Sequence, residues 1–256
     1  MHHVALTEPM TCEFVDAYMY EHGLPEPLAG FLAHHIEQPQ EDFLEAASES
    51  GTFVVADGVT LDIPALLEHG KRYPHPSPSG AVARAFCRAI AEQGGNTDML
   101  DMFRIANSAV EDIATGDGVA YAHNPTNRYA ATAAFITIAR NTVHWASICD
   151  SYAAHFDASM KLLHHSSGTC APYAVVNGEE RMTEHLEHGS WQAQSGDTII
   201  LATDGFIPHL TDTGFLALFA SDTLPMQGDI QQYTAHKNQE DPFQYGHERT
   251  LIAVRL

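Results

Sequence analysis

Two apolar runs in this chain each end in an Asp-Gly pair. Residues 53–56 (Phe-Val-Val-Ala) lead into Asp57-Gly58, and residues 198–202 (Thr-Ile-Ile-Leu-Ala) lead through Thr203 into Asp204-Gly205. Short apolar runs that stop at a turn signal are typical of buried β-strands. A carboxylate at the end of such a strand is held rigidly, and the glycine after it lets the backbone turn and leaves its carbonyl accessible. The pattern therefore predicts core strands that present acidic side chains at their ends.

The rest of the chain mixes helical and strand patterns. Apolar residues at helical spacing predict two consecutive helices, and a later pair of apolar runs around a short polar turn predicts a hairpin. We expect residues 1–35 to supply an edge strand and an opening helix. With no linker or repeat dividing it, the chain is expected to form one domain over 1–256, an α+β fold in which sheets stack and helices cover them. The predicted helices are 82–90, 99–113 and 215–219, and the other predicted strands are 134–138, 143–148 and 250–256.

The net charge of the chain limits the classes of partner that it can bind. The 256 residues carry a formal net charge of −21 with histidine neutral. Such a field repels nucleic acid and anionic membranes and attracts cations, so we expect neither of those two partners. No stretch approaches eighteen apolar residues, and the first nine residues lack the basic start and apolar run of a signal peptide.

The four cysteines are scattered, at Cys12, Cys87, Cys149 and Cys170, with no CxxC pair. A disulfide framework is not expected in a chain of this length, which favours the reducing cytoplasm. We interpret Cys149, at the end of an apolar strand, as a small buried residue rather than a nucleophile.

Acidic residues accompany the strand ends elsewhere too. Glu41-Asp42 precedes the first Asp-Gly strand, and Asp150 follows the second strand of the hairpin. Carboxylates and carbonyls are the ligands that hard cations such as Mg²⁺ and Mn²⁺ prefer. Acids at several strand ends therefore indicate a divalent cation site.

The order of these motifs resembles the protein phosphatase 2C family from about Glu41 to the C-terminus. The family's Glu-Asp pair resembles Glu41-Asp42, and its strand ending in Asp-Gly resembles Phe53–Val59. Its Gly-Asp-Ser resembles Cys149-Asp150-Ser151. Its Gly-Asp, apolar run, Asp-Gly block resembles Gly196–Phe206, and its terminal Asp-Asp/Asn-x-Thr resembles His247–Thr250.

The resemblance implies a four-layer α-β-β-α sandwich of two antiparallel sheets, with two Mn²⁺ or Mg²⁺ ions at one end. Water activated between the two ions would attack the phosphorus of a phosphoserine or phosphothreonine in a protein substrate. By position, Asp57 would bridge the ions and Asp42 would orient the water. The remaining implied ligands are the Gly58 carbonyl, Glu41 for the second ion, Asp204 for the first, Asp150 with Asp204 for a weaker third ion, and His247 at the place of the terminal Asp.

The chain departs from the family pattern at several positions. His247 or the adjacent Glu248 replaces the terminal Asp ligand, and both alternatives remain open. Thr60 replaces the second glycine of Asp-Gly-x-Gly, and Cys149 replaces the glycine of Gly-Asp-Ser. The family's basic residue upstream of the Glu-Asp pair, which binds substrate phosphate in many members, is replaced by acidic or amide side chains. Pro208 stands where an acid often follows the second Asp-Gly. These changes raise an alternative: a catalytically weak or inactive regulatory module with the same fold.

Other functions fit less well. A haloacid-dehalogenase-type phosphatase needs a nucleophilic Asp two residues before the Asp-Gly, and that position is Val55. The histidine doublets lack the spacing of a zinc motif and are interpreted as surface residues. A phosphorylated small molecule remains open as substrate.

Overall fold

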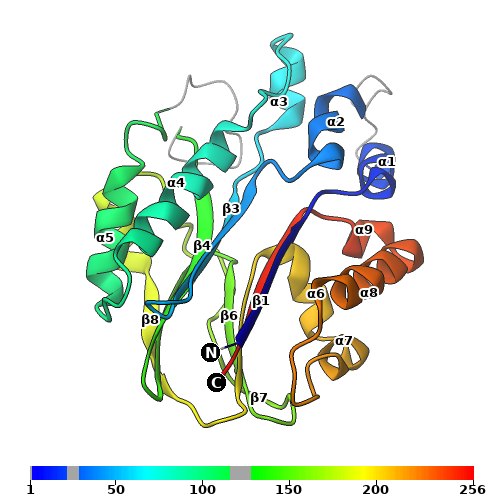
Figure 1. Cartoon of the computed structure of the whole chain (residues 1–256). Helices are drawn as coiled ribbons and strands as arrows, with labels where there is room; N and C mark the ends of the chain where they lie inside the picture. The colour runs from blue at the N-terminus through cyan, green and yellow to red at the C-terminus, as the bar shows by residue number, and fades with distance from the viewer. Residues whose placement is uncertain (1, 22–28, 116–127) are drawn as a thin grey trace.

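A computed structural model describes residues 2–21, 29–115 and 128–256, and these form two stacked β-sheets (Figure 1). Each sheet has five strands, and every neighbouring pair is antiparallel. The predicted α+β sandwich of antiparallel sheets is confirmed. The first sheet runs β1 (His2–Glu8), β10 (Arg249–Arg255), β9 (Thr198–Ala202), β6 (Tyr152–Phe156) and β7 (Leu162–His165). The second runs β2 (Asp42–Ala47), β3 (Thr52–Gly58), β4 (Ala131–Ala139), β5 (Thr142–Ile148) and β8 (Glu187–Gln192).

Helices cover both outer faces (Figure 1). Helices α4 and α5 lie on the second sheet, and α6 to α8 lie on the first, which completes four layers. No described helix is long and apolar enough to cross a bilayer. The helices are α1 (Cys12–Glu21), α2 (Ala29–Glu37), α3 (Ile63–Glu68), α4 (Pro78–Glu92), α5 (Met99–Ala109), α6 (Ile207–Leu210), α7 (Thr213–Ala217), α8 (Gln227–Glu240) and α9 (Pro242–Tyr245), with 3-10 turns η2 (Glu180–His185) and η3 (Asp204–Phe206).

Strand β3 shows why the sandwich needs apolar residues on both of its faces. Phe53 and Val55 pack between the sheets, whereas Val54 and Ala56 pack beneath α4 and α5. Successive side chains of a strand point to opposite faces, so a strand between two apolar layers must be apolar at every position. This explains the continuous run that was visible in the sequence.

The start of α4 fixes the loop that precedes it. The Ser77 side chain caps the helix by accepting a hydrogen bond from the Gly80 N–H, and Pro78 occupies the first helical position. Both choices are favourable at a helix N-terminus. The Pro-rich segment before α4 is therefore an ordered loop, and it places Tyr73 and Ser77 beside the end of β3.

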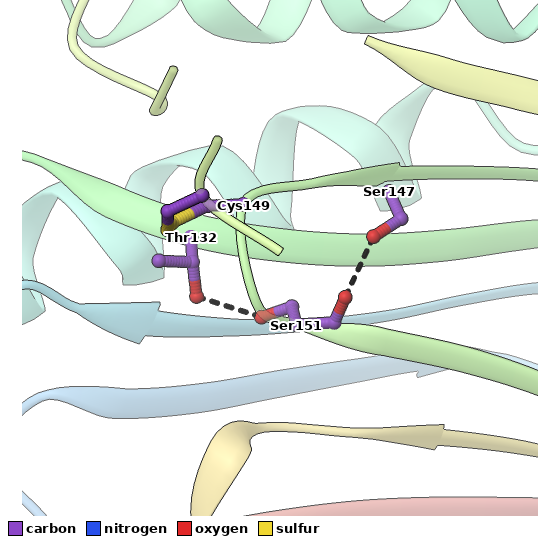
Figure 2. Close-up of a disulfide and its surroundings, with 5 residues drawn as sticks. Thr132, Ser147, Cys149 and Ser151 are labelled. Atoms are coloured by element: carbon purple, nitrogen blue, oxygen red, sulfur yellow. Dashed lines mark hydrogen bonds between the residues drawn. A yellow bond between two sulfur atoms is a disulfide. The ribbon is translucent and has the colours of Figure 1, made fainter. Parts of the chain in front are cut away.

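The sequence-based expectation about cysteines was wrong for one pair. Cys149 and Cys170 form a disulfide, with their Cα atoms 4.1 Å apart (Figure 2). The bond joins the β5–β6 turn to a loop 21 residues later in the sequence, a pairing that no short cysteine motif reveals. Figure 2 also shows two hydrogen bonds of Ser151 in the same turn. Its hydroxyl is hydrogen-bonded to the Thr132 hydroxyl, and its carbonyl accepts a hydrogen bond from the Ser147 hydroxyl. Cys12 and Cys87 are free thiols.

Loss of this disulfide should destabilise the protein. We expect Cys170→Ser to lower the free energy of unfolding by about 3 kcal/mol without reductant, because the open chain regains the entropy of a loop of this length. Urea titration measures the change, with Cys12→Ser as the control for an exposed free cysteine. Wild-type protein in dithiothreitol should show the same loss. An unchanged midpoint on reduction would contradict the expectation.

Candidate metal centre

Four aspartates meet at the end of the sandwich nearest α2 and α3 (Figure 1). Asp42 begins β2 and lies directly opposite Asp57, near the end of β3, in the ladder. Asp204 opens the turn after β9, and Asp150 lies in the β5–β6 turn. The charges of Asp42, Asp204 and Asp150 all act on Asp57. The strand-end acids predicted from the sequence are therefore brought together by both sheets.

A threonine fastens the two sheets beside these acids. Thr203, between β9 and Asp204, donates its hydroxyl proton to Asp42 Oδ2 at 2.7 Å. Its hydroxyl oxygen accepts the N–H of Thr250 at 2.8 Å, and its own N–H donates to the Thr250 carbonyl. Asp42 is thereby held in one orientation by β9 and β10 of the opposite sheet.

Burial and mutual repulsion disfavour ionisation of these carboxyl groups. Burial raises the pKa of Asp57 well above its usual range, and the charges of Asp42 and Asp204 raise it further. Burial and the charge of Glu248 do the same to the pKa of Asp42, although a hydrogen bond from Thr203 opposes them. Burial, followed by the charge of Asp204, raises the pKa of Asp150 to about 6. Bound cations would relieve both causes.

Glu41 has a different environment from the aspartates. Its Oε1 accepts hydrogen bonds from the Tyr73 hydroxyl at 2.5 Å and the Ser77 hydroxyl at 2.8 Å, and its Oε2 accepts one from the Thr60 hydroxyl at 2.8 Å. His35 Nε2 lies 3.5 Å from Oε2. Burial raises the pKa of Glu41, but hydrogen bonds and the charge of His35 outweigh it, so the net shift is downward.

Glu248 also contacts the start of β2. Its Oε1 accepts the backbone N–H groups of Gln40, Glu41 and Asp42 at 2.9, 2.8 and 2.6 Å. Its Oε2 is buried without a hydrogen-bond partner. Burial and the charge of Glu41 raise the pKa of Glu248 to about 7. The carboxylate therefore ties β10 to Glu41-Asp42 and keeps one oxygen available.

His247 lies outside this cluster of contacts. Its ring packs on Phe14 of α1 with centroids 4.1 Å apart. Burial and the charge of Arg249 lower its pKa. Of the two alternatives left open by the sequence, Glu248 is the one that contacts the start of β2.

The residues at this end fit a hard divalent cation. Asp150 Oδ1 and Glu248 Oε2 are buried oxygens without hydrogen-bond partners, and oxygen is the ligand atom that Mn²⁺ and Mg²⁺ prefer. Gly58 lies so close to α4 that a Cβ would come within 2.6 Å of the Ser79 backbone, so only glycine fits here. The backbone that carries the Gly58 carbonyl is thereby held beside Asp57.

Several contacting residues were missed by the sequence reasoning. His35, Tyr73, Ser77 and Thr203 all contact Glu41 or Asp42. Only Thr203 carried a signal, as the neighbour of an Asp-Gly pair. Tyr73 and Ser77 belong to a loop without a metal-binding motif. His35 belongs to one of the histidine doublets expected at the surface, and that expectation was wrong for His35, which is buried beside Glu41.

Comparison with known proteins gives one family match. The protein phosphatase 2C family model matches residues 32–238. No curated protein matches the chain by sequence. Among solved structures, the serine/threonine phosphatase PstP/Ppp of Mycobacterium tuberculosis has a TM-score of 0.60 at 16% identity over 100% of this chain and 98% of that chain. PppA of Pseudomonas aeruginosa has a TM-score of 0.63 at 14% identity over 100% and 97%.

A third structure contains metal. The catalytic domain of PstP in complex with 2 manganese ions has a TM-score of 0.60 at 14% identity, and the match covers 98% of this chain and 96% of that chain. At these low identities the likeness is one of fold.

Stability should depend on pH in a specific direction when divalent cations are removed. A carboxyl group with a higher pKa in the folded than in the unfolded chain binds more protons when folded, so raising the pH favours unfolding. For Glu248 this interval runs from 4.5 to about 7, and for Asp150 from 3.8 to about 6. Urea titrations in chelator should therefore show lower stability at pH 7.5 than at pH 5, and excess Mn²⁺ should reduce the difference. Stability that increases across this interval in chelator would contradict the expectation.

The anchoring role of Glu248 can be tested separately. We expect Glu248→Ala to lower the free energy of unfolding by about 3 kcal/mol, because buried backbone N–H groups lose their acceptor. Glu248→Gln keeps an acceptor oxygen and should cost less than about 1 kcal/mol. Urea titration measures both. Equal losses in the two variants would argue against the hydrogen bonds as the cause.

Proposed function

Because the chain belongs to the protein phosphatase 2C family of metal-dependent serine/threonine phosphatases, we propose that it removes phosphate from phosphoserine and phosphothreonine in protein substrates. The observation that carries the proposal is the meeting of four aspartates at one end of the sandwich, where Asp42 is buried, Asp57 and Asp150 are half-buried and Asp204 is exposed to solvent. Loss of solvation raises the pKa of Asp204 as well. Carboxylates that repel one another in this way favour divalent cations as their neutralising partners.

In this proposal two Mn²⁺ or Mg²⁺ ions bind at the acidic end. Asp57 would serve both ions, Glu41 the second and Asp204 the first. The Gly58 carbonyl would serve one of them, and Asp150 with Asp204 would hold a weaker third ion. For the terminal ligand, the free buried oxygen of Glu248 supports Glu248 over His247. When bound, the ions neutralise the phosphoryl oxygens and lower the pKa of a water molecule.

The chain's own residues position the reactants. Asp42 accepts a hydrogen bond from Thr203 at Oδ2, which leaves Oδ1 to orient the attacking water and to accept its proton. The rigid ends of β2 and β3 keep Asp42 beside Asp57, so the geometry does not depend on a flexible loop. In-line attack of water on phosphorus breaks the bond to the serine or threonine oxygen, which takes up the proton that Asp42 accepted and leaves as the alcohol.

The alternative function is a weakly active or inactive regulatory module with the same fold. The hydroxyl groups around Glu41 favour it, because they occupy a carboxylate that the family pattern assigns to the second ion. The cytoplasmic location predicted from the sequence remains part of the main proposal. In that compartment the Cys149–Cys170 bond would exchange with cellular thiols.

Hydrolysis of p-nitrophenyl phosphate and of a phosphothreonine peptide tests the proposal. We expect turnover with Mn²⁺ and none with chelator. Asp57→Asn and Asp204→Asn should each reduce kcat/KM by about 100-fold or more, because each removes an anionic ligand of the cations whose charge stabilises the transition state. Asp222→Asn, at an exposed position away from the acidic end, is the matched control and should keep wild-type activity.

Circular dichroism must show that the variants remain folded. Wild-type turnover in each of the two single variants, Asp57→Asn and Asp204→Asn, would refute the proposed site. A folded wild-type protein without turnover under Mn²⁺ or Mg²⁺ would instead favour the regulatory module.

A further inference from the structure

The carboxylate of Glu41 already accepts three hydrogen bonds from its own chain. A carboxylate offers about four lone-pair sites. Tyr73 and Ser77 donate to Oε1, Thr60 donates to Oε2, and His35 Nε2 lies 3.5 Å from Oε2. The remaining site, on Oε2, lies beside His35, so a cation that binds Oε2 competes with the Thr60 hydroxyl for this oxygen.

The donors differ in how easily they can be displaced. Tyr73 and Ser77 are 6% and 2% exposed, and both are fixed by further hydrogen bonds. The Tyr73 hydroxyl accepts the N–H of Leu61, and the Ser77 hydroxyl accepts the N–H of Gly80 at the start of α4. Thr60 is exposed, two residues beyond Gly58. Its hydroxyl is thus the donor nearest to solvent and the first that an incoming cation meets.

The other acids of the centre contrast with Glu41. Glu248 Oε2 and Asp150 Oδ1 are buried without hydrogen-bond partners, and the Glu248 side chain is only 8% exposed. A cation that binds such an oxygen gains a charge-assisted contact and breaks no existing hydrogen bond. Positions built on these oxygens and on Asp57 therefore do not carry the displacement cost that Glu41 imposes.

We propose that the two cation positions of this chain have unequal affinities, because the Thr60 hydroxyl masks Glu41 Oε2 and weakens the position that needs Glu41. Thr60 occupies the place of a family glycine, which has no side chain and cannot make this hydrogen bond. The inference rests on the proposed two-cation site. Its consequence is a phosphatase that holds one cation at low Mn²⁺ and becomes fully loaded only as the Mn²⁺ concentration increases.

The test measures Mn²⁺ binding to the full chain by isothermal titration calorimetry and by the electron paramagnetic resonance signal of free Mn²⁺. Wild type should show two classes of site that differ by about tenfold or more, the scale of one charge-assisted hydrogen bond. Thr60→Val removes the hydroxyl at nearly constant shape and should tighten only the weaker class, by about tenfold. Thr60→Gly should do the same, whereas Thr60→Ser keeps the hydroxyl and should keep both wild-type affinities.

Each outcome has a distinct meaning. The inference would be overturned, even for an active enzyme, if both wild-type sites bound Mn²⁺ with equal affinity. It would also be overturned if the Thr60→Val and Thr60→Gly proteins bound Mn²⁺ as the wild type does. Unequal binding that responds to Thr60 as expected, without turnover of p-nitrophenyl phosphate, would support the inference and refute the proposed activity. In an active enzyme, the Mn²⁺ concentration for half-maximal activity should decrease in Thr60→Val.

Discussion

Repulsion between closely spaced carboxylates is the constraint on which this acidic end depends. Loss of solvation raises the pKa of Asp42, Asp57 and Asp204, and neighbouring acidic charges raise the pKa of Asp42 and Asp57 further. Carboxylates that repel one another stay close only if the fold holds their backbone in place. The packing of β3 holds Asp57 in place, because moving Asp57 away would require β3 to leave its position between two apolar layers.

The fold was predictable where local pattern and tertiary burial agree. The continuous apolar runs of β3 and β9 identify strands with two buried faces, and their Asp-Gly ends identify where the acids lie. The helical spacing before and after Asp98 likewise identifies α4 and α5, with Asp98 capping the second, but α5 ends at Ala109 rather than at residue 113, and Ile113 is exposed. In each case the sequence pattern follows the same period as the structure, so one observation determines the element and its buried face.

The contacts around Glu41 and the disulfide were not predictable in this way. Tyr73 and Ser77 reach Glu41 from a loop more than thirty residues away, and Cys170 reaches Cys149 from another loop. These pairs have no period and no motif, because they depend on where the loops cross. The choice between His247 and Glu248 needed the structure for a related reason. Adjacent residues of an extended chain point to opposite sides, and only the structure shows which side faces β2.

Two of the departures from the family pattern act on Glu41. Thr60 adds a hydroxyl to its Oε2, and Glu248 holds its backbone N–H and those of its two neighbours. Both changes stabilise one conformation of Glu41 with groups from the chain itself. The aspartates have less internal compensation, although Asp42 accepts a hydrogen bond from Thr203, and their combined charge favours a cation from solution. The same end of the sandwich therefore contains Glu41, whose charge is compensated by hydrogen bonds from the chain, and aspartates, whose charges are compensated mainly by cations. The cation position that needs Glu41 is for this reason expected to bind more weakly than the position that does not.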